Sequence, residues 1–144
     1  MRAFTWSVLF ALGMSACTSA SGTTSAIAKD HPLSGPTWVL EMIGDKKPIG
    51  EVPLSFHLMS NGQIGGSGGC GELFGLWFQA KPEDPIGLVG TTDQDPNCSR
   101  DVKEQEQRYV WLLDLVKTYQ AAGDTLTMTT STGTSLRFRR APGN

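Results

Sequence analysis

Hydrophobic and polar residues alternate along much of the chain after residue 36, which is the pattern of half-buried β-strands. In residues 37–43 (TWVLEMI), Trp38, Leu40 and Met42 share one face. Residues 54–59 alternate in the same way. We expect further strands at residues 74–80, 86–89, 125–130 and 134–140. The pattern therefore predicts a domain built mainly from short strands.

Asn61-Gly62 lies between two strand patterns and predicts a hairpin, because both central residues of a type I′ turn need positive φ. The return strand runs into residues 65–71 (GGSGGCG), which contain five glycines. Glycine within a strand usually marks a bulge, a bend or the close approach of another backbone. We interpret this cluster as the bends that let a sheet curl towards a barrel.

Gly66, Gly68 and Gly71 also match G-x-G-x-x-G, the pattern of loops that hold the phosphates of a dinucleotide. That chemistry needs a helix immediately after the loop, because the helix N-terminus supplies the amide groups and the positive dipole end. The next residues, 72–78 (ELFGLWF), are aromatic and predict a strand. We therefore expect no nucleotide and no other cofactor.

One helix is predicted, over about residues 100–119. Asp101 and Glu104 have the spacing of a capping box, and Gly123 lies just past the predicted end. The apolar face of this helix contains Val102, Tyr109, Leu113 and Val116. Strands, one helix and then strands indicate an α+β, mainly β fold: a curled antiparallel sheet or small β-barrel-like domain with one packed helix.

The N-terminus has the features of a secretory signal: Arg2, a short apolar run over residues 4–12, and small residues before Cys17. The apolar run is shorter than the ~20 residues that span a bilayer. Residues 14–17 (MSAC) resemble the bacterial lipobox, which implies a lipidated Cys17; the alternative is an ordinary secretory signal with an incidental cysteine. Thr18 is not the aspartate that commonly retains Gram-negative lipoproteins at the inner membrane, which favours the outer membrane facing the periplasm.

This interpretation divides the chain into a lipoprotein signal peptide (1–16), a lipidated cysteine with a flexible spacer (17–35) and a folded domain (36–141). Loss of residues 1–16 removes Arg2 and reduces the basic residues from 12 to 11, against 14 acidic residues. This charge gives no reason to expect nucleic acid as a partner.

With Cys17 lipidated, Cys70 and Cys98 are the remaining cysteines, and a bacterial envelope is an oxidising compartment. We favour a disulfide between them, which on the chain-entropy model would add roughly 3 to 4 kcal/mol of stability. The alternative is two separate buried cysteines.

The order of several short motifs resembles the META domain of HslJ-type heat-shock proteins and small bacterial lipoproteins. These motifs are Trp38-Val39-Leu40, Gly66-Ser67-Gly68-Gly69-Cys70 followed by Phe74-Gly75, Glu106-x-x-Tyr109-x-x-x-Leu113, and Leu136-x-Phe138. The resemblance covers nearly all of residues 36–140. It implies a small β-barrel-like fold with a helix, an envelope location and links to stress in some members, and it implies no agreed biochemical activity.

Catalytic and metal chemistry find little support in the residues. A Ser-His-Asp or Cys-His arrangement would depend on His57 alone, because His31 lies in the predicted spacer. Cys70, Cys98 and His57 lack the spacing of a zinc site, so we expect no metal. Glu104 and Glu106 are two apart on a helix and point in different directions, so we interpret Glu106 as a hydrogen-bonded structural carboxylate.

Three side chains form a candidate contact surface. Trp77 and Phe78 point to opposite sides of their strand, and we take Trp77 as an exposed aromatic candidate. Arg137 and Arg139 share a strand face that suits an anionic headgroup or an acidic partner; the alternative is a solvated face that protects a sheet edge.

We expect a non-catalytic envelope lipoprotein, attached to a membrane through Cys17 and acting through protein contacts in stress tolerance or envelope maintenance. The alternative is a carrier that holds a small apolar ligand inside the curled sheet. A continuous cavity of roughly 300 Å³ or more would favour the carrier, whereas a filled interior with an exposed apolar patch would favour the interaction module.

Overall fold

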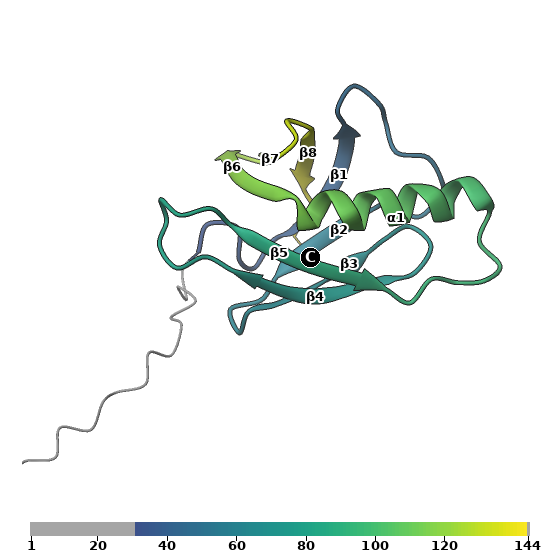
Figure 1. Cartoon of the computed structure of the whole chain (residues 1–144), viewed down its shortest axis with the longest axis horizontal. Coiled ribbons are helices and arrows are strands. Elements are labelled where there is room, and N and C mark those ends of the chain that lie inside the picture. Colours follow the sequence, from purple (N-terminus) through teal and green to yellow (C-terminus); the bar gives the residue numbers. More distant parts are fainter. Residues whose placement is uncertain (1–30, 144) are drawn as a thin grey trace, which may run out of the picture.

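The computed structural model describes residues 31–143, which form one eight-stranded antiparallel sheet and a helix (Figure 1). The strands lie in the order β5-β4-β3-β2-β1-β8-β7-β6. The elements along the chain are β1 (Thr37–Ile43), β2 (Ser55–Leu58), β3 (Gln63–Ser67), β4 (Glu72–Phe78), β5 (Gly87–Thr92), α1 (Arg100–Asp114), β6 (Val116–Ala122), β7 (Thr125–Thr130) and β8 (Ser135–Arg140). The predicted mainly β fold with one packed helix is confirmed.

The sheet curls into a half-barrel, and α1 lies along its concave side (Figure 1). The two ends of the sheet meet at one hydrogen bond, where the backbone N–H of Ile86 donates to the carbonyl of Lys117 at 3.0 Å. Asp114, at the end of α1, accepts a hydrogen bond from the backbone N–H of Gly90 at 3.0 Å. The outer side of β5 is therefore partly covered by the chain itself, which limits its exposure as an edge strand.

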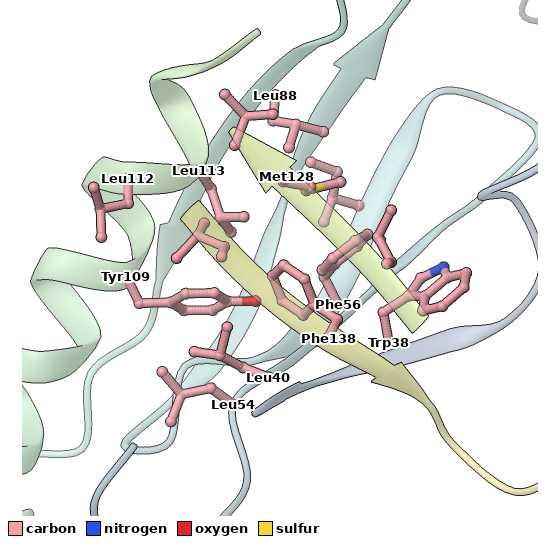
Figure 2. Close-up of a cluster of buried hydrophobic side chains, with 14 of the residues drawn as sticks. Trp38, Leu40, Leu54, Phe56, Leu88, Tyr109, Leu112, Leu113, Met128 and Phe138 are labelled. Carbon is pink, nitrogen blue, oxygen red and sulfur yellow. The ribbon is translucent and has the colours of Figure 1, made fainter. Parts of the chain in front are cut away.

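The interior of the half-barrel is filled by packed side chains from the sheet and the helix (Figure 2). Trp38, Phe56 and Phe138 are fully buried, and the rings of Phe56 and Phe138 meet edge to face with centroids 4.9 Å apart. Leu112 and Leu113 enter the same cluster from α1. The alternation seen in the sequence thus places an apolar face of most strands in the core that α1 covers.

Tyr109 places a polar group in this apolar interior. Its ring points from α1 towards Phe56 and Phe138 in Figure 2, and the side chain is completely buried. The hydroxyl has no hydrogen-bond partner among the described residues. Burial raises the pKa of Tyr109 well above its ordinary value, so the phenol stays neutral.

The helix is shorter than predicted. It ends at Asp114, and residues 116–122, which we assigned in part to the helix, form β6. The apolar residues Val116 and Tyr119 fit a helical spacing, but β6 pairs with β7 along its length, with one irregularity between Val116 and Thr118. Gly123, with φ of 59°, turns this hairpin and does not terminate a helix.

The hairpin at Asn61-Gly62 is confirmed, but its turn is not type I′. Only Gly62 has positive φ, at 88°, and its N–H donates to the carbonyl of Met59 at 3.0 Å. The loop is therefore a three-residue connection that ends in a left-handed glycine. The side chain of Asn61 accepts a hydrogen bond from the N–H of Gln63 at 3.1 Å, which stabilises the negative-φ form.

The packed domain begins earlier than the predicted boundary at residue 36. Leu33 is fully buried, and His31 is only 8% exposed. The imidazole Nε2 of His31 lies 2.6 Å from Oε1 of Gln79, and its Nδ1 accepts a hydrogen bond from the N–H of Leu33 at 3.2 Å. Polarity made residues 31–35 resemble a spacer, but these contacts fix them to the sheet; the remaining predicted spacer, the signal peptide and Cys17 lie outside the described residues.

Candidate functional site

The glycine-rich turn between β3 and β4 faces a buried carboxylate on α1. Glu106 is fully buried, and its Oε2 accepts hydrogen bonds from the backbone N–H groups of Cys70 at 3.0 Å and Gly71 at 2.7 Å. Its Oε1 accepts from the hydroxyl of Thr92 at 2.9 Å and from the amide of Gln94 at 3.1 Å. Four donors satisfy this charge, as a buried carboxylate requires.

This geometry explains the phosphate-loop pattern in the sequence. The turn does present backbone N–H groups to an anion, but that anion is the protein's own Glu106. A Cβ at Gly68 would overlap with the Glu106 carboxylate, so the turn accommodates no larger residue there. A strand follows directly at Glu72, as predicted, and the structural interpretation of Glu106 agrees with its four hydrogen bonds.

The favoured disulfide is confirmed. Cys70 is bonded to Cys98, with their α-carbons 5.8 Å apart, within the usual range for a bridge. The bond joins the glycine-rich turn to the residue that precedes the first turn of α1. The turn is thus fixed to the helix both by sulfur and by the carboxylate of Glu106.

Trp77 is not part of an exposed contact surface, so this prediction is wrong. The side chain is 2% exposed, and its indole N–H donates to the carbonyl of Met59 at 2.8 Å. Trp77 shares the inner face of β4 with Leu73, whereas its neighbour Phe78 points outwards and is 59% exposed. Alternation identified the two faces correctly but did not say which one meets the core.

An apolar stripe covers the outer face of β4 and β5. It consists of Phe74, Leu76 and Phe78 on β4 and Val89 on β5, each at least half exposed. Leu76 lies directly opposite Val89 in the ladder, so the stripe is continuous across the two strands. Exposed apolar residues gathered in this way are typical of an interaction surface.

Arg137 and Arg139 are exposed, as predicted, but they share an acidic neighbour. Nε of Arg139 lies 2.6 Å from Oε1 of Glu41, and Nε of Arg137 lies 3.7 Å from its Oε2. The hydrogen bond and the charge of Glu41 raise the pKa of Arg139. β8 lies between β1 and β7, so these arginines do not protect a sheet edge.

The family model of the META domain matches residues 31–143, which includes every described strand and the helix. The chain belongs to the META domain family. The match covers the same residues that the structure describes.

Solved structures with the same fold as this META domain share little sequence with it. An NMR structure of a protein from Burkholderia xenovorans is 16% identical with a TM-score of 0.60, over 77% of this chain and 85% of that one. A crystal structure of a DUF4847 family protein from Bacteroides vulgatus is 14% identical with a TM-score of 0.57, over 78% of this chain and 97% of that one. No curated protein matches the chain. These likenesses show the fold alone.

The two histidines of the META domain lie in different places. His31 is buried beside Trp77 and Tyr119, with the Tyr119 hydroxyl 3.2 Å from its Nε2. His57 lies on β2, where its imidazole covers Gly65 on the outer face. Within residues 31–143, no group of three or more His, Cys, Asp or Glu side chains is placed to hold a metal ion. No helix in that range is long and apolar enough to cross a bilayer.

Sequence reasoning missed the partners of Glu106. Thr92 is the last residue of β5 and Gln94 follows it, 14 and 12 positions before Glu106, and nothing in their spacing marks them as its hydrogen-bond donors. The sequence did contain one indication: a carboxylate next to the apolar face of the helix, and a glycine-rich turn with unpaired backbone N–H groups. Because a buried carboxylate needs hydrogen-bond donors, these two features together predict a contact between them.

Proposed function

We propose that this protein is a non-catalytic lipoprotein of the bacterial cell envelope whose META domain acts through protein contacts in stress tolerance or envelope maintenance. The lipobox-like residues 14–17 support a lipid on Cys17, and Thr18 supports the outer membrane. Thirteen residues separate Cys17 from His31. Even fully extended, this segment keeps the domain within about 50 Å of its lipid.

The observation that carries the proposal is the apolar stripe on a domain whose interior is filled. Phe74, Leu76, Phe78 and Val89 expose between 50% and 60% of their surface. Soluble domains rarely place several large apolar residues together in water without a partner. A protein surface with its own apolar patch fits this stripe, because burial of both removes apolar area from water.

The packed interior favours this function over the carrier. The space between the sheet and α1 is occupied by Trp38, Phe56, Tyr109 and Phe138 together with aliphatic side chains (Figure 2). A carrier of an apolar molecule needs that space for its ligand.

Site-specific crosslinking in the native host tests the contact. A photoreactive phenylalanine analogue is placed at Leu76, and at Ile49 as the matched control, since Ile49 is 49% exposed in a loop away from the stripe. We expect a discrete protein adduct from position 76 and none from position 49. Phe78→Ser should remove the adduct and reduce stress tolerance, whereas Ile49→Ser should do neither.

Equal crosslinking from both positions, or full stress tolerance in Phe78→Ser cells, would contradict the contact proposal. The tether is tested separately by mass spectrometry of the membrane-extracted protein. We expect an N-terminal Cys17 carrying a diacylglycerol and an amide-linked acyl chain. An unmodified Cys17 in the mature chain would contradict the lipid anchor and leave the contact proposal in place.

A further inference from the structure

A groove of about 570 Å³ runs over the outer face of β2, β3 and β4. The register places His57 opposite Gly65, and Gly65 opposite Phe74, so these three residues form one row across the strands. Directly opposed residues on neighbouring strands present their side chains to the same face. Gly65, in the middle of the row, has no side chain, and the imidazole of His57 covers it.

The rings beside this row lie over glycine backbone. A Cβ at Gly65 would come within 2.7 Å of Nε2 of His57, so the imidazole occupies the place that a side chain would take. In the same way, the distal ring atoms of Phe78 lie over Gly87 on β5. Phe74 lies in the cross-strand row of His57 and is 50% exposed, whereas Phe78 is four residues further along β4, beyond Leu76. Within the groove, the aromatic platform therefore consists of the imidazole of His57 and the ring of Phe74.

Polar groups with unused hydrogen-bonding capacity border the platform. The side chains of His57 and Glu72 line the groove and form no hydrogen bond or ion pair with another described residue. The side-chain oxygen of Gln63 accepts a hydrogen bond from the amide of Asn61 at 2.8 Å, and the side-chain N–H groups of Gln63 have no partner in the described chain. An imidazole, an amide donor and a carboxylate acceptor thus surround an apolar surface, which is the usual composition of a small-ligand site.

The charge of the groove restricts its ligand. Glu72 is the one charged residue among its lining side chains, so a phosphate or another anion would be repelled. The same charge disfavours single-stranded nucleic acid, which would otherwise suit an aromatic platform, because such sites need cations along the backbone.

The place of the groove in the sheet excludes a bound peptide strand. β3 is paired on both sides, with β2 and β4, so its backbone groups are already used in the ladder. A peptide that binds as an added strand needs a free sheet edge. The face is therefore suited to a ligand that is recognised through its rings and hydroxyl groups.

We propose that this groove binds a sugar residue of a neutral glycan. The apolar face of the sugar ring stacks on Phe74 and His57, in the way that exposed faces of small β-barrels bind oligosaccharides. One sugar hydroxyl donates to Glu72, and another accepts from the free amide of Gln63. This binding goes beyond the proposed protein contact. The groove and the apolar stripe share Phe74 and Leu76, whereas His57, Gln63 and Glu72 belong to the groove alone, so Glu72→Ala tests the groove without altering the stripe.

Titration by ¹H–¹⁵N NMR tests the site, with the full-length chain carrying Cys17→Ser so that it cannot be lipidated. The probes are a β-1,4-linked tetramer of N-acetylglucosamine and, as a second neutral glycan, maltotetraose. We expect at least one of them to shift the amide signals of residues 57, 63, 65, 72 and 74 with a millimolar dissociation constant. Glu72→Ala and Phe74→Ala should each weaken binding by about 5-fold or more.

Glu83→Ala and Trp111→Ala are the matched controls, because Glu83 is an exposed carboxylate and Trp111 an exposed aromatic outside the groove. Neither should change the dissociation constant by more than about 2-fold. The proposal is overturned if neither sugar shifts these signals at 20 mM, a concentration of about ten times the expected constant. Shifts that centre on other residues, or that survive Glu72→Ala and Phe74→Ala unchanged, overturn it as well.

Discussion

At the scale of single residues, Tyr109 carries a polar atom that the fold does not satisfy. Its buried hydroxyl has no partner among the described residues, and burying such a group costs about 1 to 3 kcal/mol. Tyr109→Phe removes the oxygen and keeps the ring. We expect the free energy of unfolding, measured by urea denaturation at pH 7, to rise by about 1 kcal/mol.

Tyr119→Phe serves as the control, because the Tyr119 hydroxyl does have a partner in His31, and its loss should lower stability slightly. The pH dependence gives a second test. Burial raises the pKa of Tyr109, so above the ordinary phenol value of 10.0 the unfolded chain loses this proton first. The wild-type protein should therefore lose stability above about pH 10 more steeply than the Tyr109→Phe variant. If Tyr109→Phe were instead less stable than the wild type at pH 7, the hydroxyl would have a stabilising partner, and the prediction would be wrong.

Alternation in the sequence showed which residues share a face of a strand, but it did not show which of the two faces is buried. Trp77 and Phe78 were correctly assigned to opposite faces, yet the wrong one was placed outside. Both rings are large and apolar, and the deciding contact is a carbonyl of Met59, eighteen positions away, that accepts the indole N–H. Only the register of β3 and β4 brings that carbonyl within reach, and register is a property of the folded sheet.

At the scale of elements, Glu106 connects α1 to the glycine-rich turn and to the end of β5 with the residues that follow it. Glu106→Ala would leave four donors without their acceptor in a buried place. We expect the free energy of unfolding to fall by about 3 kcal/mol or more in urea denaturation.

Glu104 is the matched control for this substitution. It lies on the same helix, two residues earlier, with its side chain 61% exposed and paired to Arg100. Glu104→Ala should change stability by no more than about 0.5 kcal/mol. If both variants lost a similar amount of stability, the four hydrogen bonds of Glu106 would contribute little to the free energy of unfolding.

The element that sequence analysis missed is β6, and the reason is local ambiguity. Residues 116–122 (VKTYQAA) follow a helix directly, contain good helix formers and carry apolar residues at a helical spacing. Their strand conformation depends on pairing with β7 and on a bulge between Val116 and Thr118. The β1 strand, by contrast, was predicted with its observed bounds. Its alternation holds for Trp38 and Leu40 only, because a bulge between Leu40 and Met42 places Ile43 in the core in place of Met42.

At the scale of the whole molecule, contacts between segments that are distant in sequence keep the two ends of the curled sheet together. A single backbone hydrogen bond joins β6 to the residue before β5, so the sheet itself provides little closure. The filled interior and the helix supply the rest, since α1 packs its buried residues into the concave side of the sheet. The positions of Cys70 and Cys98 place a covalent link where the helix begins.

The disulfide should therefore stabilise the closed molecule without determining its fold. Its cysteines are 28 positions apart, and closing a loop of that size lowers the entropy of the unfolded chain by an amount worth roughly 3 to 4 kcal/mol. In the Cys70→Ala/Cys98→Ala variant, we expect the free energy of unfolding to fall by about 3 kcal/mol, with an unchanged circular dichroism spectrum. Glu106 still accepts hydrogen bonds from the N–H groups of the turn in that variant, so the turn keeps its place on α1.

A reducing agent should lower the stability of the wild-type protein to the same level and leave the variant unaffected. A loss of folded structure in the variant would instead show that the carboxylate alone cannot hold the turn against the helix.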